Sequence, residues 1–197
     1  IIGYGKENNV QSGWEGALLN KWVVSIKNIF EYPLKEEDDK PVWITPLASG
    51  STPMKKAFEN AKRLCQDWIN WGNHRECHPP IIINITDGEA TDGGNNYQSL
   101  INEVNELKQL RTNYGLVNVL NIHISEKISD RVLFPNEVDN LNNKFSRLLF
   151  DMSTPLNENM VRIALQKGYN ISNNPKGYIY NGNAVDLINF LNIGTPQ

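Results

Sequence analysis

Two short segments of the chain carry side chains whose types and spacing suit chemistry with a metal ion. The first is Ser49-Gly50-Ser51-Thr52-Pro53, which gathers hydroxyl groups, and the second is Thr86-Asp87-Gly88, which supplies a carboxylate. Hydroxyl and carboxylate oxygens are the ligands that hard cations such as Mg²⁺ prefer. The two segments are therefore the first candidates for a cation site.

Each segment also has a purely structural interpretation. Thr52 stands where a helix N-cap is expected, before Pro53 at the favoured first helical position, and taken alone the cap is the preferred interpretation. Asp87 directly follows an apolar run, so its carboxylate would emerge at the end of a strand, or it would cap the next turn through its own backbone. The sequence leaves both alternatives for Asp87 open.

Other side chains are weaker candidates. Asp92, in Thr91-Asp92-Gly93-Gly94, repeats the pattern of Asp87 and is either a second metal ligand or, as we prefer, part of a flexible turn. Glu89 is expected near the same rim without an assigned role, and His123 within a strand is expected to be a core histidine. One further group lacks the paired spacing of zinc ligands and is interpreted as a polar loop: His74, Cys77 and His78.

The elements that would position these residues follow the order of an α/β protein. Apolar residues recur with a helical period over 53–71 and again over 97–112. The run 81–86 is rich in β-branched residues and barely alternates, which is typical of a parallel strand buried on both faces. A strand over 116–125 completes a right-handed strand–helix–strand unit, and ligands of such sheets bind at the carboxyl ends of the strands.

The remaining segments predict shorter elements, and residues 1–197 are expected to form a single α/β domain. The predicted elements are strands at 1–5 and 10–14 joined by a turn, helix or strand at 22–26, a charged loop at 31–41, helices at 140–152 and 157–168, a strand at 177–180 and a helix at 184–191.

Composition narrows the classes of function. The 197 residues carry 19 basic and 22 acidic side chains, a formal net charge of −3, so no basic surface for nucleic acid is expected. No apolar stretch reaches the roughly 18–20 residues that cross a bilayer. The two cysteines, Cys65 and Cys77, do not make a disulfide framework, and we therefore expect the reducing cytosol.

A resemblance sharpens the metal hypothesis. Gly50-Ser51-Thr52-Pro53-Met54, followed by Ile83-Asn84-Ile85-Thr86-Asp87-Gly88-Glu89, resembles the second and third parts of the metal-ion-dependent adhesion site of von Willebrand factor A domains. The likeness to stand-alone bacterial members of that family covers essentially the whole chain. It is carried by Ile2-Gly3-Tyr4-Gly5, Trp14-Glu15-Gly16, His78-Pro79-Pro80, Asn121-Ile122-His123-Ile124-Ser125, Leu148-Leu149-Phe150 and Phe190-Leu191-Asn192-Ile193-Gly194-Thr195.

The resemblance implies a fold and a function. The fold would be a three-layer α/β/α, doubly wound and Rossmann-like domain with a mostly parallel sheet. Thr52 would bind Mg²⁺ or Mn²⁺ through its hydroxyl, and Asp87 would bind it as the acidic ligand, often through water. A carboxylate from a partner protein would complete the coordination, so the expected function is metal-dependent protein binding without catalytic residues.

One part of the family pattern is missing from this sequence. No Asp-x-Ser-x-Ser motif occurs, although the family carries it after its first strand. We expect that strand and its helix to lie upstream of Ile1, with the strand placed between 1–5 and 81–86. The metal site in these residues would then be incomplete, and we expect weak Mg²⁺ binding and poor folding of this chain alone.

Two alternatives to a metal-dependent binder stay open. The first is a scaffold domain whose metal site is inactive. The second, less favoured, is a Mg²⁺-dependent phosphohydrolase with Asp87 as nucleophile or metal ligand, for which Glu126-Lys127 offer an acid and a cation at the end of a predicted strand. No Ser-His-Asp order, glycine-rich phosphate loop or dinucleotide fingerprint supports an enzyme.

Overall fold

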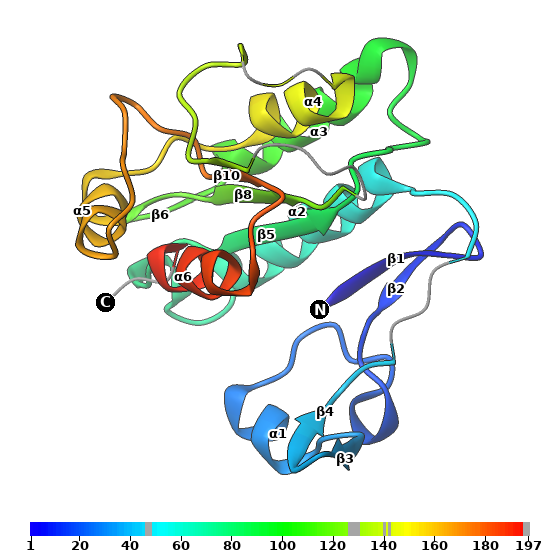
Figure 1. Ribbon diagram of the computed structural model, residues 1–197. Coiled ribbons are helices and arrows are strands. Elements are labelled where there is room, and N and C mark those ends of the chain that lie inside the picture. The colour runs from blue at the N-terminus through cyan, green and yellow to red at the C-terminus, as the bar shows by residue number, and fades with distance from the viewer. Residues whose placement is uncertain (46–48, 126–130, 140, 142, 195–197) are drawn as a thin grey trace.

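A four-stranded sheet flanked by helices forms the body of the protein. The computed structural model describes residues 1–45, 49–125, 131–139, 141 and 143–194, and its arrangement is shown in Figure 1. The strand order is β5 (Ile81–Thr86), β8 (Asn118–His123), β10 (Tyr178–Tyr180) and β9 (Val132–Leu133). The first three strands are parallel and β9 runs antiparallel to β10. The protein is therefore mixed α/β, as the sequence predicts.

Helices cover both faces of this sheet because its strands carry apolar residues on both faces. Along β8, Val119 packs into a cluster with α2 (Met54–Asn70), α3 (Gln98–Gln109) and α4 (Lys144–Met152). The next residue, Leu120, packs into a second cluster with α5 (Glu158–Gln166) and α6 (Ala184–Gly194). Successive side chains of a strand point to opposite faces, so these clusters lie on opposite sides of the sheet. The predicted parallel pairing of 81–86 with the following strand is confirmed.

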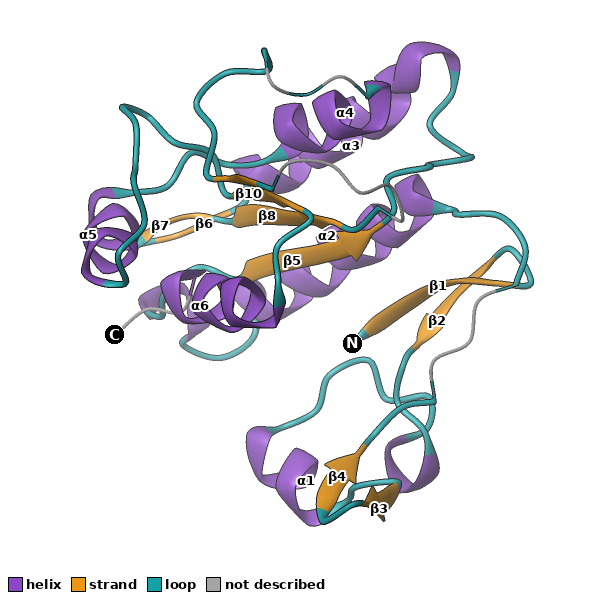
Figure 2. Ribbon diagram, in the orientation of Figure 1, coloured by secondary structure: helices purple, strands orange, loops and turns teal. Residues whose placement is uncertain are grey.

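The N-terminal residues form a smaller lobe beside the body (Figure 2). Here β1 (Ile2–Lys6) pairs antiparallel with β2 (Asn9–Ser12), which confirms the predicted hairpin. The chain continues through the short helix α1 (Ile26–Glu31), and then β3 (Lys35–Glu37) pairs antiparallel with β4 (Lys40–Val42). The described residues also form three 3₁₀ turns: η1 (Gly16–Leu18), η2 (His74–Glu76) and η3 (Asn95–Tyr97).

Several predicted boundaries are wrong. The expected loop at 31–41 contains the β3–β4 hairpin, whose turn residues Asp38 and Asp39 adopt φ values of 49° and 60°. Its strands are exposed, so they show no apolar alternation that would reveal them. The helix predicted to reach residue 112 ends at Gln109, because the chain turns into a second small hairpin, β6 (Arg111–Thr112) with β7 (Gly115–Leu116).

The outer edge of β5 is open in the part of the chain that the structure describes. On one side of β5, the backbone pairs with that of β8. At the two ends of this pairing, Pro80 O accepts from Asn118 N–H and Thr86 O accepts from Ile124 N–H. On the other side no described strand pairs with β5. The side chain of Tyr4, from β1, contacts this strand, and its hydroxyl donates a hydrogen bond to Asn84 Oδ1 at 2.5 Å.

No helix within the described residues is long and apolar enough to cross a membrane.

Candidate functional site

Asp87 lies at the carboxyl end of β5, as the sequence predicts. Its side chain is exposed, and Oδ1 accepts a hydrogen bond from the backbone N–H of Glu89 at 3.2 Å. The carboxylate therefore emerges at the rim and also caps its own turn, while its role as a metal ligand stays a prediction. A carboxylate that accepts one N–H keeps further lone pairs for a cation.

Gly88 allows the Asp87 turn to lie close against the body. Its φ is +88°, a value that strains other residues. A Cβ at this position would lie 2.8 Å from Phe145 Cβ and 3.2 Å from His123 Nε2. The turn also receives support from Thr86, whose Oγ1 accepts from the N–H of Gly88 at 3.1 Å. Only glycine therefore fits between the strand end and α4.

Thr52 is not the N-cap of α2, and that prediction is wrong. The helix begins at Met54, the cap position is Pro53, and no side chain of that residue caps the helix. Thr52 is half-buried and instead uses its backbone: its N–H donates to Thr91 Oγ1 at 3.1 Å and its carbonyl accepts from Thr91 N–H at 3.0 Å. The hydroxyl of Thr52 is therefore not committed to capping.

The cap of α2 comes from Asp92, a distant residue. Its Oδ1 accepts from Lys55 N–H and its Oδ2 accepts from Lys56 N–H, each at 2.9 Å. Asp92 does lie in a bend, but both of its oxygens bind the first turn of a 17-residue helix, a contact that the interpretation as a flexible turn did not include. Together with the bonds between Thr52 and Thr91, these contacts tie the hydroxyl segment to the segment that follows Asp87.

A buried polar pair lies beneath this rim, and the sequence analysis missed it. Asn84 of β5 and Asn121 of β8 are direct partners in the parallel register, and Asn84 Nδ2 donates to Asn121 Oδ1 at 2.9 Å. Asn121 Nδ2 continues the network to Leu149 O at 3.1 Å and Ser153 Oγ at 2.9 Å. The available signal was an asparagine between apolar residues in each strand, in Ile83-Asn84-Ile85 and in Leu120-Asn121-Ile122.

His123 is a core histidine, as predicted, and it supports the Asp87 turn. Only 1% of its surface is exposed, and its Nδ1 lies 3.0 Å from Ser146 Oγ and 3.2 Å from Tyr178 Oη. Burial lowers the pKa of His123, while a hydrogen bond with the backbone of Asp87 acts in the opposite direction. The neutral ring therefore links the turn to α4 and β10.

Tyr4 is the second titratable group beside this rim. Burial raises the pKa of its hydroxyl to about 12, and the negative charge of Asp87 acts in the same direction. The hydroxyl consequently stays protonated at neutral pH and serves as a donor to Asn84 Oδ1.

The donors at the rim suit a hard cation in type but supply only part of a coordination shell. Thr52 offers a neutral hydroxyl and Asp87 a carboxylate, whereas Mg²⁺ requires a near-octahedral set of oxygens. Among the described residues, no group of three or more His, Cys, Asp or Glu side chains lies together. A cation held here would need further oxygens from water or from another molecule.

The remaining sequence candidates do not join this site. His74 stacks on Trp68 with ring centroids 4.3 Å apart, and its Nδ1 lies 2.9 Å from Trp68 O. His78 instead contacts the ring of Tyr114, and Cys77 is exposed. Glu89 is exposed in the Asp87 turn. Glu126 and Lys127 lie outside the described residues.

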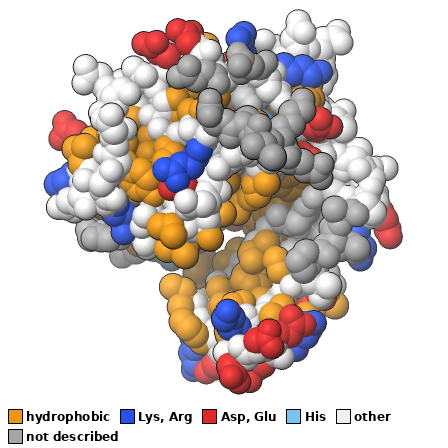
Figure 3. All heavy atoms as spheres, in the orientation of Figure 1, with side chains coloured by type: hydrophobic (Ala, Val, Ile, Leu, Met, Phe, Trp, Pro, Cys, Tyr) orange, Lys and Arg blue, Asp and Glu red, His pale blue; other side chains and the backbone are white. Residues whose placement is uncertain are grey.

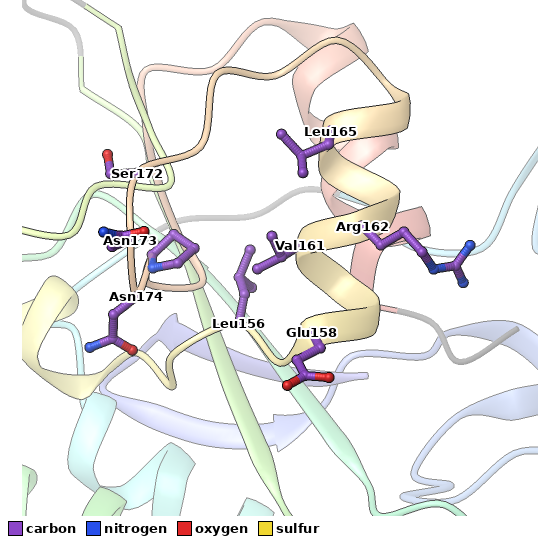
Figure 4. Close-up of a pocket in the computed structure, with 9 residues that line it drawn as sticks. Leu156, Glu158, Val161, Arg162, Leu165, Ser172, Asn173 and Asn174 are labelled. Carbon is purple, nitrogen blue, oxygen red and sulfur yellow. The ribbon is translucent and has the colours of Figure 1, made fainter.

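Two cavities lie away from the rim. One, of about 400 Å³, is an open groove between α5 and residues 172–175, where Leu156, Val161 and Leu165 form an apolar wall (Figure 4). The other, of about 680 Å³, is lined by Ile81 and Asn118, the first residues of β5 and β8. That second cavity is therefore at the end of the sheet opposite Asp87.

Comparison with known proteins adds no relative. No protein-family model matches the chain, and no curated protein and no solved structure is significantly similar to it. The function must therefore be argued from the residues and their geometry.

Proposed function

We propose that this protein is a protein-binding module that depends on a divalent cation, with the cation held at the carboxyl end of β5 by Thr52 and Asp87. The observation that carries the proposal is the pair of hydrogen bonds between the backbone of Thr52 and the N–H and hydroxyl of Thr91, which fixes the hydroxyl segment against the segment after Asp87. In open α/β sheets, this end of the parallel strands is where ligands bind.

The donor chemistry supports a binder of acidic groups. One carboxylate and one neutral hydroxyl leave one of the two positive charges of Mg²⁺ or Mn²⁺ uncompensated. An anionic oxygen from outside is therefore the favoured additional ligand, and in a protein partner that oxygen belongs to an aspartate or glutamate side chain.

We also propose the finer fold, a three-layer, doubly wound and Rossmann-like domain of the von Willebrand factor A type. The helices on both faces of the sheet and the parallel order of β5, β8 and β10 support it. So does the open edge of β5, where the family places another strand between this strand and β1.

The surroundings of that edge are apolar. Figure 3 shows hydrophobic side chains gathered in a hollow between the body and the N-terminal lobe. Apolar side chains exposed on the elements nearby include Ile85 of β5 at 53%, Ile188 of α6 at 59% and Ile26 of α1 at 73%. Charges and prolines that usually protect an edge strand do not occur between Ile81 and Thr86.

The proposed cation site is tested by titrating the chain with Mn²⁺ and measuring the dissociation constant by calorimetry. We expect Asp87→Asn and Thr52→Val each to weaken binding by about tenfold or more, a change of about 1.4 kcal/mol. Glu89→Gln is the matched control, since it removes a charge from the same turn at a residue without a proposed role.

The proposal fails in either of two outcomes. One is that the unchanged protein binds no Mn²⁺, which favours a scaffold role. The other is that Asp87→Asn and Thr52→Val bind Mn²⁺ as tightly as Glu89→Gln does.

A further inference from the structure

We propose that Asp92 is a positioning residue, which caps α2 from another segment and thereby holds Thr52 against the Asp87 turn. The consequence for metal binding rests on the proposed function, whereas the consequence for the position of Thr52 does not. Asp92 was a candidate ligand in the sequence, and the geometry gives it a different task.

The first turn of α2 needs an acid that its own sequence does not provide. The cap residue is Pro53, no side chain of the helix start accepts a bond there, and the first turn contains no acidic residue. It contains instead Lys55 and Lys56, whose positive charges are unfavourable at the positive end of the helix dipole. Asp92 compensates both deficits, because its carboxylate accepts the N–H groups of both lysines at 2.9 Å.

Asp92 is itself held on both sides, so its position is well defined. On one side Thr91 exchanges two hydrogen bonds with the backbone of Thr52. On the other side Gly93 lies tightly against Tyr97, whose Cδ1 would be 2.7 Å from a Cβ at that glycine. Ser99 Oγ donates to Gly93 O at 2.6 Å. Loss of the Asp92 carboxylate would therefore remove its two bonds to the first turn of α2 and leave only the bonds between Thr52 and Thr91 to hold the helix start against this loop.

The same contacts argue against Asp92 as a direct metal ligand. Both of its oxygens accept an N–H from the first turn of α2, so the whole carboxylate faces the helix start, whereas the bond within the Asp87 turn is to Oδ1 alone. A ligand and a positioning residue also respond differently to Asp92→Asn. The amide keeps one side-chain oxygen that can accept from the helix, but it removes the charge on which a ligand depends.

The test compares Asp92→Ala and Asp92→Asn with the unchanged protein by amide hydrogen exchange without metal. In Asp92→Ala we expect the amides of Thr52, Lys55 and Lys56 to exchange about 2- to 30-fold faster, the factor that corresponds to loss of an N-cap. Amides of α3 should keep their rates, which separates local release from general destabilisation. Asp92→Asn should show a smaller acceleration at the same amides.

Asp67→Asn is the matched control, because it removes an exposed acid from the same helix far from its first turn. The inference is overturned if the amides of Thr52, Lys55 and Lys56 keep their rates in Asp92→Ala, or if α3 accelerates equally. In parallel Mn²⁺ titrations, Asp92→Asn should bind more tightly than Asp92→Ala. If both variants lose the same Mn²⁺ affinity while the amides of Thr52, Lys55 and Lys56 keep their exchange rates, Asp92 is a ligand and the inference is also overturned. If the unchanged protein binds no Mn²⁺, the proposed function fails while the exchange rates still decide the role of Asp92.

Discussion

Replacement of Asn121 by leucine should destabilise the protein strongly, although the two side chains are similar in size. Asn121 is fully buried, and it accepts from Asn84 while donating to Leu149 O and Ser153 Oγ. The network joins the edge strand β5 and its parallel neighbour β8 to α4. Its loss would affect the strand end that positions the candidate cation site.

The magnitude follows from the groups that lose their partners. Leu149 O keeps two donors, Ser153 N–H at 3.1 Å and Ser153 Oγ at 2.7 Å. Asn84 Nδ2, in contrast, would keep only the sulfur of Met54 at 4.0 Å, and a buried donor without an acceptor costs about 1–3 kcal/mol. With the poorer fit of leucine, which costs up to about 1.5 kcal/mol, we expect Asn121→Leu to lower the free energy of unfolding by about 2–4 kcal/mol.

The assay is urea unfolding followed by far-ultraviolet circular dichroism, with Asn84→Leu and the double variant included. Because the double variant removes the donor together with its acceptor, its cost should be smaller than the sum of the single costs by about 1–2 kcal/mol. Strict additivity, or a cost of Asn121→Leu below about 0.5 kcal/mol, would refute the reasoning.

Three further predictions concern other parts of the chain. Burial lowers the pKa of His123 in the folded protein, so protonation of this residue favours the unfolded chain. The free energy of unfolding should therefore be highest above the unfolded pKa of about 6.5 and should fall by up to about 1.4 kcal/mol per pH unit as the pH drops toward the folded pKa. Urea unfolding at several pH values should show this dependence, and His123→Gln should remove it. Asn157→Ala removes the cap that accepts from Met160 N–H at 2.9 Å and should cost about 0.5–2 kcal/mol of unfolding free energy, measured in the same way. An unpaired edge strand can pair with a second chain, so we expect the unchanged protein to self-associate as its concentration rises in sedimentation velocity, and Ile85→Lys, which places a charge beside the open edge of β5, should reduce this self-association.

Each of these predictions has a matched control. His78→Gln changes an exposed histidine and should leave the pH dependence in place. Asn159→Ala changes an exposed asparagine inside the same helix, so it should cost nothing. Leu165→Lys introduces the same charge at a similarly exposed position of α5. Equal effects of a variant and its control would contradict the corresponding prediction.

The periodicity of apolar residues was sufficient to predict the long helices and strands, but it was insufficient to predict the short ones. The helix over 54–70 and the strands over 81–86 and 118–123 bury one or both faces against neighbours, and burial leaves a regular apolar pattern. The β3–β4 and β6–β7 hairpins have strands of three and two residues. Such strands are too short for a pattern to develop, and their pairing depends on the turn between them.

The partners of the candidate site residues could not be predicted in the same way. Asp92 lies 37 residues after Lys55 in the sequence, and their contact exists because α2 packs beside the end of β5. The local rule pointed to Thr52 as the cap, since it considers only residues next to the helix start. A carboxylate from elsewhere occupies that role in the folded chain, and this leaves the Thr52 hydroxyl uncommitted to the helix.

By itself, the sequence determined that a parallel strand over 81–86 is followed directly by Asp87 and that a hydroxyl-rich segment precedes a long amphipathic helix. It predicted burial of that strand on both faces, which is wrong, because Ile85 is 53% exposed at the open edge. Apolar pattern and composition report how deeply each residue is buried, and this information is local. The tertiary structure alone decided which strands are neighbours, with Asn84 opposite Asn121 and β5 at an open edge of the described sheet. It also decided which side chain caps α2, because a hydrogen bond depends on the distance between two groups in space and not on their separation along the chain.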